Sequence, residues 1–215
     1  GVCIKNSYNT VISKSIINSN HAVGGGGICC IYSLSNHTRV EKVLLYDNYQ
    51  AISVGISSVD IINCTVFDKN NGEAIHSESS IINILNSIVW TEGTWGIYSY
   101  VDPQYIGSII TVANSCIIKG ISGVGKGVQD SLNWLGGNIS DDPLFNNISK
   151  NDYSLKKNSL CIDSGISYFS IEGRVIVELK EDMYRGYSPD MAAFESDYSI
   201  QNIVAEQISD SDNII

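Results

Sequence analysis

The chain has 215 residues, a formal net charge of −10, nineteen glycines and three prolines, a length that fits one large domain or two small ones. The acidic balance argues against a nucleic-acid partner, because neutralising phosphates requires clustered Lys and Arg side chains. No stretch reaches the roughly 18 apolar residues that a membrane helix needs. Ile, Val, Asn and Ser are frequent, whereas the good helix formers Ala, Glu and Lys are scarce. This balance favours an all-β fold.

Three sets of short apolar phrases follow one another along the chain. The first set occupies residues 2–6, 27–31, 51–55, 74–78 and 96–100. The second occupies residues 10–13, 38–41, 58–62, 80–84 and 109–113. The third begins polar and turns apolar, at residues 13–20, 41–48, 63–70, 86–93 and 114–121. Because Gly1-Val2-Cys3-Ile4 already belongs to this pattern, we expect the natural chain to begin upstream of it.

The phrases of the third set start 22 to 28 residues apart, and a period in the twenties is typical of a solenoid. Three short strands per period, with Gly, Asn and Ser between them, predict a right-handed parallel β-helix whose coils stack about 4.8 Å apart. Two asparagine columns support this register, since Asn tolerates left-handed corners and stacked amides bond along the axis. The columns are Asn63, Asn86 and Asn114, and Asn20, Asn48 and Asn70.

The repeat fades from about Ser131. A solenoid end exposes an open sheet edge and an uncovered core, so it needs a cap. We therefore divide the chain into β-helix coils at 1–130, a C-terminal coil and irregular cap at 131–197, and a polar tail or linker at 198–215.

Four ordered phrases in this last part resemble a known family. They are "DPLF", "DYSL", "SLCIDSG" and "DMAAFE", and they contribute Asp142, Pro143, Leu144, Phe145, Asp152, Tyr153, Leu155, Ser159, Ile162, Asp163, Gly165, Asp190, Ala193, Phe194 and Glu195. Over roughly 130–197 the chain resembles secreted bacterial parallel β-helix proteins of the pectate-lyase-like superfamily, many of them catalogued as choice-of-anchor Q proteins. Ala192 replaces the usual Gly of the last phrase, and Cys161 stands where Ala is frequent. The "GGGGICCIYS" coil at 24–33 is also typical of the superfamily.

The resemblance implies a protein of the cell surface or the exterior that binds or cleaves polysaccharide. It does not by itself imply catalysis, because the matched phrases lie in a segment that resembles a cap. We expect Asp142, Asp163 and Asp190 to form turn and capping hydrogen bonds.

The six cysteines, Cys3, Cys29, Cys30, Cys64, Cys116 and Cys161, show no CxxC spacing, which argues against a zinc site. Buried thiols that pack as small hydrophobic groups are one interpretation. One or two disulfides are the other, and Cys3 with Cys29 is the first pair to consider.

The first strand of each coil is the predicted functional face. Alternation directs Ile4, Ile28, Ile52, Ile75 and Ile97 inward and Lys5, Cys29, Ser53, His76 and Tyr98 outward. Beside the outward column run the small residues Cys3, Gly27, Ala51, Ala74 and Gly96. Small residues beside larger polar ones predict a shallow groove along the axis, of a shape that fits a sugar chain.

His76 and Tyr98 fall on adjacent coils, so about 5 Å should separate their backbones. They are the candidate catalytic residues, as general base and acid in β-elimination from uronates. Lys5, Ser53, Glu78 and Trp95 are the candidate substrate-binding residues. Elimination also needs the uronate carboxylate to be neutralised, and no Arg falls on this face. Glu73 and Glu78 lie in one coil, so the face lacks the paired carboxyls of a hydrolase. An exposed His beside an exposed Tyr is the alternative interpretation.

No cofactor is predicted outright. Ca²⁺ is the one candidate, because Asp141 and Asp142 offer oxygen ligands on a turn, and capping of that turn is the alternative use of the same oxygens. Aromatic side chains that could stack on sugar rings, or simply pack at the corners, are Tyr46, Trp90, Trp95 and Tyr100.

Two functions remain open from the sequence. The first is the C-terminal part of a secreted or surface β-helix protein that binds or cleaves polysaccharide, with lyase chemistry favoured over hydrolysis. The second is a non-catalytic module of a larger surface protein that binds glycans, adheres or has a structural role; a virus tailspike is a more distant third. We expect a monomer within a larger chain, with polysaccharide as partner and no membrane insertion.

Overall fold

A computed structural model describes residues 1–22, 24–69, 72–101 and 105–199. The chain is all-β and forms a parallel β-solenoid of about five turns, so the predicted solenoid is confirmed. Its strands are β1 (Val2–Lys5), β2 (Val11–Asn18), β3 (Ile28–Tyr46), β4 (Ile52–Ile62), β5 (Thr65–Asp68), β6 (Ile75–Glu78), β7 (Ile81–Leu85), β8 (Ile88–Thr91), β9 (Ile97–Ser99), β10 (Ile109–Ala113), β11 (Cys116–Ile117), β12 (Val124–Gly125) and β13 (Ser131–Trp134).

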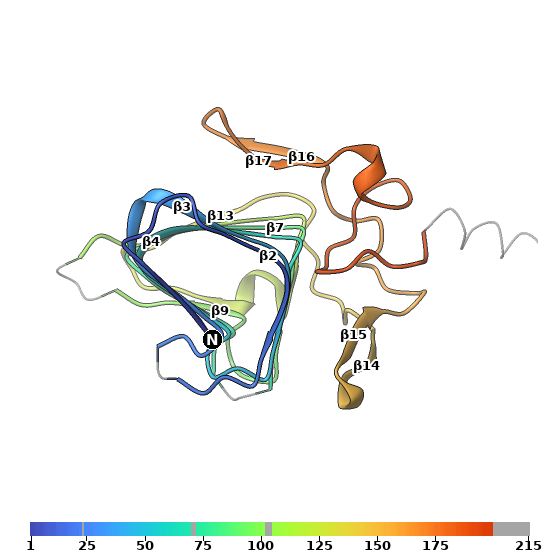
Figure 1. Cartoon of the computed structure of the whole chain (residues 1–215), viewed down its shortest axis with the longest axis horizontal. Helices are drawn as coiled ribbons and strands as arrows, with labels where there is room; N and C mark the ends of the chain where they lie inside the picture. The colour runs from blue at the N-terminus through green and yellow to red at the C-terminus, as the bar shows by residue number, and fades with distance from the viewer. Residues whose placement is uncertain (23, 70–71, 102–104, 200–215) are drawn as a thin grey trace, which may run out of the picture.

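The strands stack into three faces that enclose the core (Figure 1). The first face contains β1, the start of β3, the start of β4, β6, β9 and β12. The second contains the start of β2, the middle of β3, the end of β4, β7, β10 and β13. The third contains the ends of β2 and β3, then β5, β8 and β11.

The predicted interior file is confirmed for Ile28, Ile52, Ile75 and Ile97, which are paired in sequence across β3, β4, β6 and β9 and are fully buried. The first coil differs from the prediction. Val2 pairs with Ile28, and Cys3 with Cys29, so Ile4 and Lys5 lie two positions further along. A shift of two residues keeps every side chain on its face, so alternation alone could not reveal this error.

The corner between the second and third faces is left-handed in every complete coil. Lys14, Lys42, Asn63, Asn86 and Asn114 occupy it, with φ between 44° and 54°. The predicted asparagine column is therefore real, and Lys14 and Lys42 extend it. In the other predicted column, the Nδ2 atom of Asn20 donates to Oδ1 of Asn48 at 2.9 Å; Asn70 lies outside the described residues.

Two serine ladders along the axis were not predicted. At one corner the backbone N–H groups of Ser33, Ser57 and Ser80 each donate to the hydroxyl one coil further on, and that of Ser108 donates to Asp130 Oδ1. At another, the N–H groups of Cys64 and Ser87 donate to Ser87 and Ser115, and that of Ser115 donates to Asn138. Each ladder satisfies corner N–H groups that the strands leave unpaired.

The segment after Ile139 leaves the stack and forms β14 (Phe145–Asn147), η2 (Ile148–Lys150), β15 (Asp152–Leu155), β16 (Tyr168–Ile171), β17 (Arg174–Glu178) and η3 (Glu181–Met183). We call residues 140–199 the flanking segment. It is irregular as predicted, but it lies beside the coils rather than over their end (Figure 1). Phe145, Tyr153 and Met191 pack on Phe67 and Leu44 of the third face. Ile176 and Val177 pack on the outer side of the second face.

The family-like phrases hold the flanking segment together. Asp142 Oδ1 accepts from the N–H of Leu144, and Asp190 accepts from the N–H groups of Asp163 and Ser196. A Cβ on Gly165 would lie 2.6 Å from the carbonyl oxygen of Pro189, so only glycine fits this contact. Asp142 and Asp190 therefore form turn and backbone hydrogen bonds, as expected.

Candidate functional site

The first face is the one that the flanking segment leaves uncovered (Figure 1). Its main outward column runs through Cys3, Cys29, Ser53, His76, Tyr98 and Gly125. The sequence placed Lys5 in this column, but Lys5 pairs with Ile31 and so stands in the next one, with Gly55 and Glu78. The predicted catalytic pair is therefore adjacent. Of the predicted binding residues, Ser53 shares the His76 column, Lys5 and Glu78 stand in the next one, and Trp95 precedes β9.

His76 is oriented by a carboxylate from its own coil. Its Nδ1 atom lies 2.9 Å from Glu73 Oε1, and both side chains are about one quarter exposed or less. Gln50 Nε2 donates to the same Glu73 oxygen at 2.8 Å. A neutral imidazole that donates from Nδ1 carries its lone pair at Nε2. The arrangement thus provides one oriented, basic nitrogen on the outer face.

Tyr98 and Trp95 form an aromatic pair next to His76. Their ring centroids are 6.3 Å apart with an interplanar angle of 29°, and the Tyr98 centroid lies 6.1 Å from that of His76. Gly125 lies against both rings, because a Cβ there would stand 2.7 Å from Tyr98 and 2.8 Å from Trp95. The backbone of the last coil therefore supports the pair. Sequence reasoning missed Gly125, since a two-residue strand such as β12 gives no periodic signal; its only signal is its position one coil after Tyr98.

The predicted groove is not formed by the small residues. Ala51 and Ala74 are fully buried and belong to the core, and a Cβ on Gly27 would meet the carbonyl oxygen of Ala51 at 2.3 Å. These residues are small because the backbones come close at the corner before each strand. The small residues therefore do not open a groove, and Ser53 is buried beside the partly exposed side chains of His76 and Tyr98.

Lys5 lies far from His76 along the axis of the solenoid. Its Nζ atom stands 6.0 Å above the ring of Tyr32, and β3 and β4 separate β1 from β6. That separation is on the order of 14 Å, too long for a shared proton transfer. Glu78 is partly buried in the Lys5 column. Among the predicted aromatic groups, Tyr46 instead packs against Tyr153 of the flanking segment.

A charged cluster that the sequence did not indicate lies on the second face. Arg174 of β17 contacts both carboxylate oxygens of the buried Asp60, and Asn83 donates to Asp60 at 2.7 Å. His37 Nδ1 lies 2.5 Å from the hydroxyl of the buried Ser58. Burial, followed by the nearby Arg174, lowers the pKa of His37. Because Asp60 is committed to Arg174, this cluster holds β17 on the coils.

All six cysteines are free thiols in the structure. Burial raises the pKa of Cys30 and Cys64 to about 12, so both pack as neutral groups, the first of the two interpretations. Cys3 and Cys29 stand opposite each other on neighbouring strands. Cys116 and Cys161 share the third-face cluster.

The carboxyls proposed for Ca²⁺ do not fit a metal cage. Asp142 Oδ1 is already the acceptor for Leu144 N–H, and both Asp141 and Asp142 are exposed. Within the described ranges, no group of three or more His, Cys, Asp or Glu side chains could hold a metal ion. The turn-capping use of these oxygens is the one that the geometry supports.

Comparisons of the chain with protein-family models, with curated proteins and with solved structures find no match. Over the residues that the structure describes, no helix is long and apolar enough to cross a membrane. The class that the fold defines is a parallel β-solenoid with a laterally packed C-terminal segment.

Proposed function

We propose that the chain binds a saccharide chain along the first face of the solenoid, without catalysis. The observation that carries this proposal is the Trp95–Tyr98 pair, which rests on Gly125 beside the oriented His76. Flat aromatic groups with polar neighbours suit the apolar faces and hydroxyl edges of sugars. His76 and Glu73 supply polar contacts within the same patch, and Ser53 and Glu78 flank it.

The sequence resemblance supports the same function. The phrases around Asp142, Asp163 and Asp190 resemble those of pectate-lyase-like, choice-of-anchor Q proteins, which are secreted and bacterial. On this basis we propose that the protein is secreted or located at the cell surface. We also propose that these residues form part of a larger, monomeric chain. Polysaccharide is the proposed partner.

The test measures retention of the protein on immobilised neutral and acidic polysaccharides and compares Trp95→Ala, Tyr98→Ala and the double variant with the wild type. Loss of one stacking ring should weaken binding about tenfold. The matched control is Tyr168→Ala, which removes an exposed Tyr on β16, away from this face. Equal retention of all variants, or no retention of the wild type on any polymer, would refute saccharide binding at this patch.

A second candidate function is β-elimination from uronates, and the hydrogen bond between His76 and Glu73 favours it. In that reaction His76 Nε2 would take the proton next to the carboxylate, while the Tyr98 hydroxyl would protonate the departing oxygen. The described part of the first face offers Lys5 as a cation, too distant to neutralise the same carboxylate. Ultraviolet absorbance of an unsaturated product distinguishes the candidates. Product that disappears in His76→Ala, with binding retained, would replace the non-catalytic proposal.

A further inference from the structure

A second surface, away from the first face, carries two lysine side chains that form no ion pair with a described residue. It lies at the left-handed corner between the second and third faces, where Lys14 and Lys42 stand on the first two coils and asparagines on the next three. The change from lysine to asparagine along this corner is visible in the sequence. The segments "SKS", "EKV", "INC", "LNS" and "ANS" occupy the corner in five consecutive coils.

The asparagine part of this corner is covered by the flanking segment. Nδ2 of Asn63 donates to the carbonyl oxygen of Asp190, and Nδ2 of Asn114 donates to that of Ser164. Asn86 makes two bonds, from its Nδ2 to the Ile166 carbonyl and from the Ile166 N–H to its Oδ1. Over these coils, a peptide chain therefore satisfies the corner side chains.

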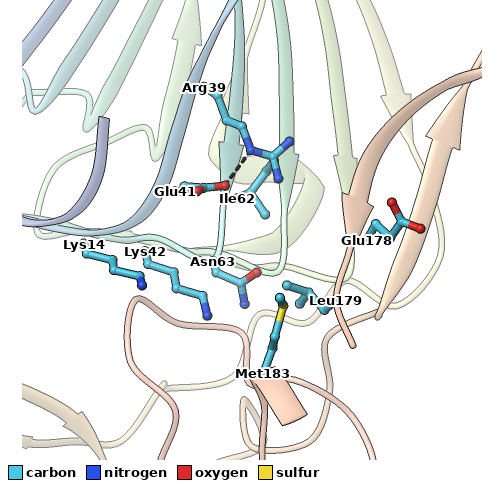
Figure 2. A pocket seen from close by; sticks show the side chains of 9 residues that line it. All are labelled: Lys14, Arg39, Glu41, Lys42, Ile62, Asn63, Glu178, Leu179 and Met183. Carbon is cyan, nitrogen blue, oxygen red and sulfur yellow. Dashed lines mark hydrogen bonds and ion pairs between the residues drawn. The ribbon is translucent and has the colours of Figure 1, made fainter. Parts of the chain in front are cut away.

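Over the lysine coils the flanking segment stands away from the corner and leaves a cavity of about 440 Å³. Figure 2 shows Lys14 and Lys42 side by side along one wall, with Leu179 and Met183 of the flanking segment opposite. The floor is formed by Arg39, Ile62 and Asn63. This volume lies within the range of small-molecule sites.

The charges around the cavity do not balance. Arg39 is bound to Glu41 at 2.5 Å and donates to the Ile176 carbonyl at 2.8 Å. Neither Lys14 nor Lys42 forms an ion pair with any described residue. Glu178 is the remaining acidic group of the lining, and it is exposed. Glu195 lies outside the lining but within electrostatic reach of Lys42, whose charge opposes the burial that raises the pKa of Glu195. Lys14 and Lys42 stand on adjacent coils, whose backbones are about 5 Å apart. Their like charges repel each other, and an anion between the ammonium groups would relieve that repulsion.

We propose that this corner cavity binds an oxyanion, the carboxylate, sulfate or phosphate group of a small ligand, between the Lys14 and Lys42 ammonium groups. Lysine binds such groups as a point charge with three donors. Arg39 is paired with Glu41 and bonded to the Ile176 carbonyl, so it fixes the floor of the cavity. The cavity is separate from the first face, so a test of anion binding in it is independent of saccharide binding on that face.

The decisive variants are Lys14→Asn, Lys42→Asn and the double variant. Asparagine is the residue that the next three coils carry at this left-handed corner, so the substitution removes the charge without straining the backbone. The matched control is Lys119→Asn, the same exchange at another left-handed position, φ 60°, outside the cavity. The probes are sulfate, phosphate and glucuronate, titrated by calorimetry at low ionic strength.

We expect the wild type and Lys119→Asn to bind at least one probe with a Kd of about 1 mM or tighter, and each single variant to bind it about tenfold more weakly. Tighter binding of glucuronate than of sulfate would assign the anion to a sugar carboxylate; the reverse order would assign it to a free inorganic anion. Absence of heat with all three probes overturns the proposal. So does unchanged binding in Lys14→Asn, whose side chain is exposed and whose loss should leave the fold intact.

Discussion

The coils and the flanking segment bury their apolar surface in different ways. In the coils, similar residues about two dozen positions apart stack into files, so Ile28, Ile52, Ile75 and Ile97 form one row and every contact is repeated. The flanking segment touches the coils through contacts that each occur once. Examples join Asn86 to Ile166, 80 residues apart, and Arg39 to Ile176, 137 apart.

This difference should separate the two regions energetically. In a solenoid each coil contacts its neighbours, so its stability is spread over many similar interfaces. The flanking segment packs on two faces of the coils through a few hydrogen bonds, the Arg174–Asp60 ion pair and two apolar clusters. We therefore expect the coils to remain folded when the flanking segment detaches. The flanking segment, in contrast, should be destabilised by the loss of a single one of its contacts with the coils.

The largest effect is expected from a break in the interior file. Ile75→Ala should lower the free energy of unfolding by about 4 kcal/mol, because strands on both sides prevent the cavity from collapsing. Ile16→Ala, at a 59% exposed position of β2, should cost about 0.5 kcal/mol or less. Urea unfolding followed by circular dichroism measures both. Similar losses for the two variants would mean that Ile75 is not held in a tight interior file.

A smaller effect, confined to the flank, is expected from Asn86→Ala. The change leaves the N–H and C=O of Ile166 without their partners, at a cost of about 2 kcal/mol. Asn114→Ala, which removes a single bond at 3.3 Å, should cost less. Hydrogen exchange is the sharper measurement: amides of β16 and β17 should exchange faster, while those of β6 and β9 keep their protection. Equal acceleration in both regions would show that flank and coils unfold as one unit.

The structure of the coils could be predicted from the sequence because every coil must bury one side of each strand and turn at the same corners. Apolar alternation and the Asn63–Asn86–Asn114 column fixed the register wherever two complete coils could be compared. The register failed at Lys5, where a shift of two residues preserves the alternation. The small residues Ala51 and Ala74 were misread as a groove, because close backbone approach and an open surface both favour small side chains.

The contacts of the flank could not be read in the same way. The Arg174–Asp60 pair and the cavity beside Lys42 depend on where a non-repeating segment docks, and nothing periodic encodes that position. At the candidate site, His76 and Tyr98 were placed together correctly, whereas the supporting Gly125 belongs to a strand too short to recognise.

A pH dependence of about 1 kcal/mol is expected from the flank alone. Burial, together with the Asp190 carboxylate, raises the pKa of Glu195 from 4.5 to about 7. Between these values the native chain holds a proton that the unfolded chain has lost. The contribution of Glu195 to the free energy of unfolding should therefore be fully present below about pH 4.5. It should be lost as the pH rises through 7, by on the order of 1 kcal/mol after solvent screening.

Glu195→Gln should flatten this fall, measured as the free energy of unfolding at pH 5 and pH 8. Burial also raises the pKa of Asp190, which acts in the same direction, whereas the lowered pKa of His37 acts in the opposite one. Comparison of the variant with the wild type isolates the contribution of Glu195. If the free energy of unfolding fell equally between pH 5 and pH 8 in the variant and the wild type, Glu195 would not be protonated in the native flanking segment.

The smallest effect is expected from reductant. Cys116 of the coils and Cys161 of the flank share one buried cluster, and their hydrogen bond, with burial, raises the pKa of Cys116. All six thiols are free, so dithiothreitol should leave the Tm unchanged, and thiol titration in denaturant should count six. A count of four would reveal one bridge, worth about 2–4 kcal/mol. Peptide mapping would then decide between Cys3–Cys29, within the coils, and Cys116–Cys161, which would fasten the flank covalently and remove the energetic separation of the two regions.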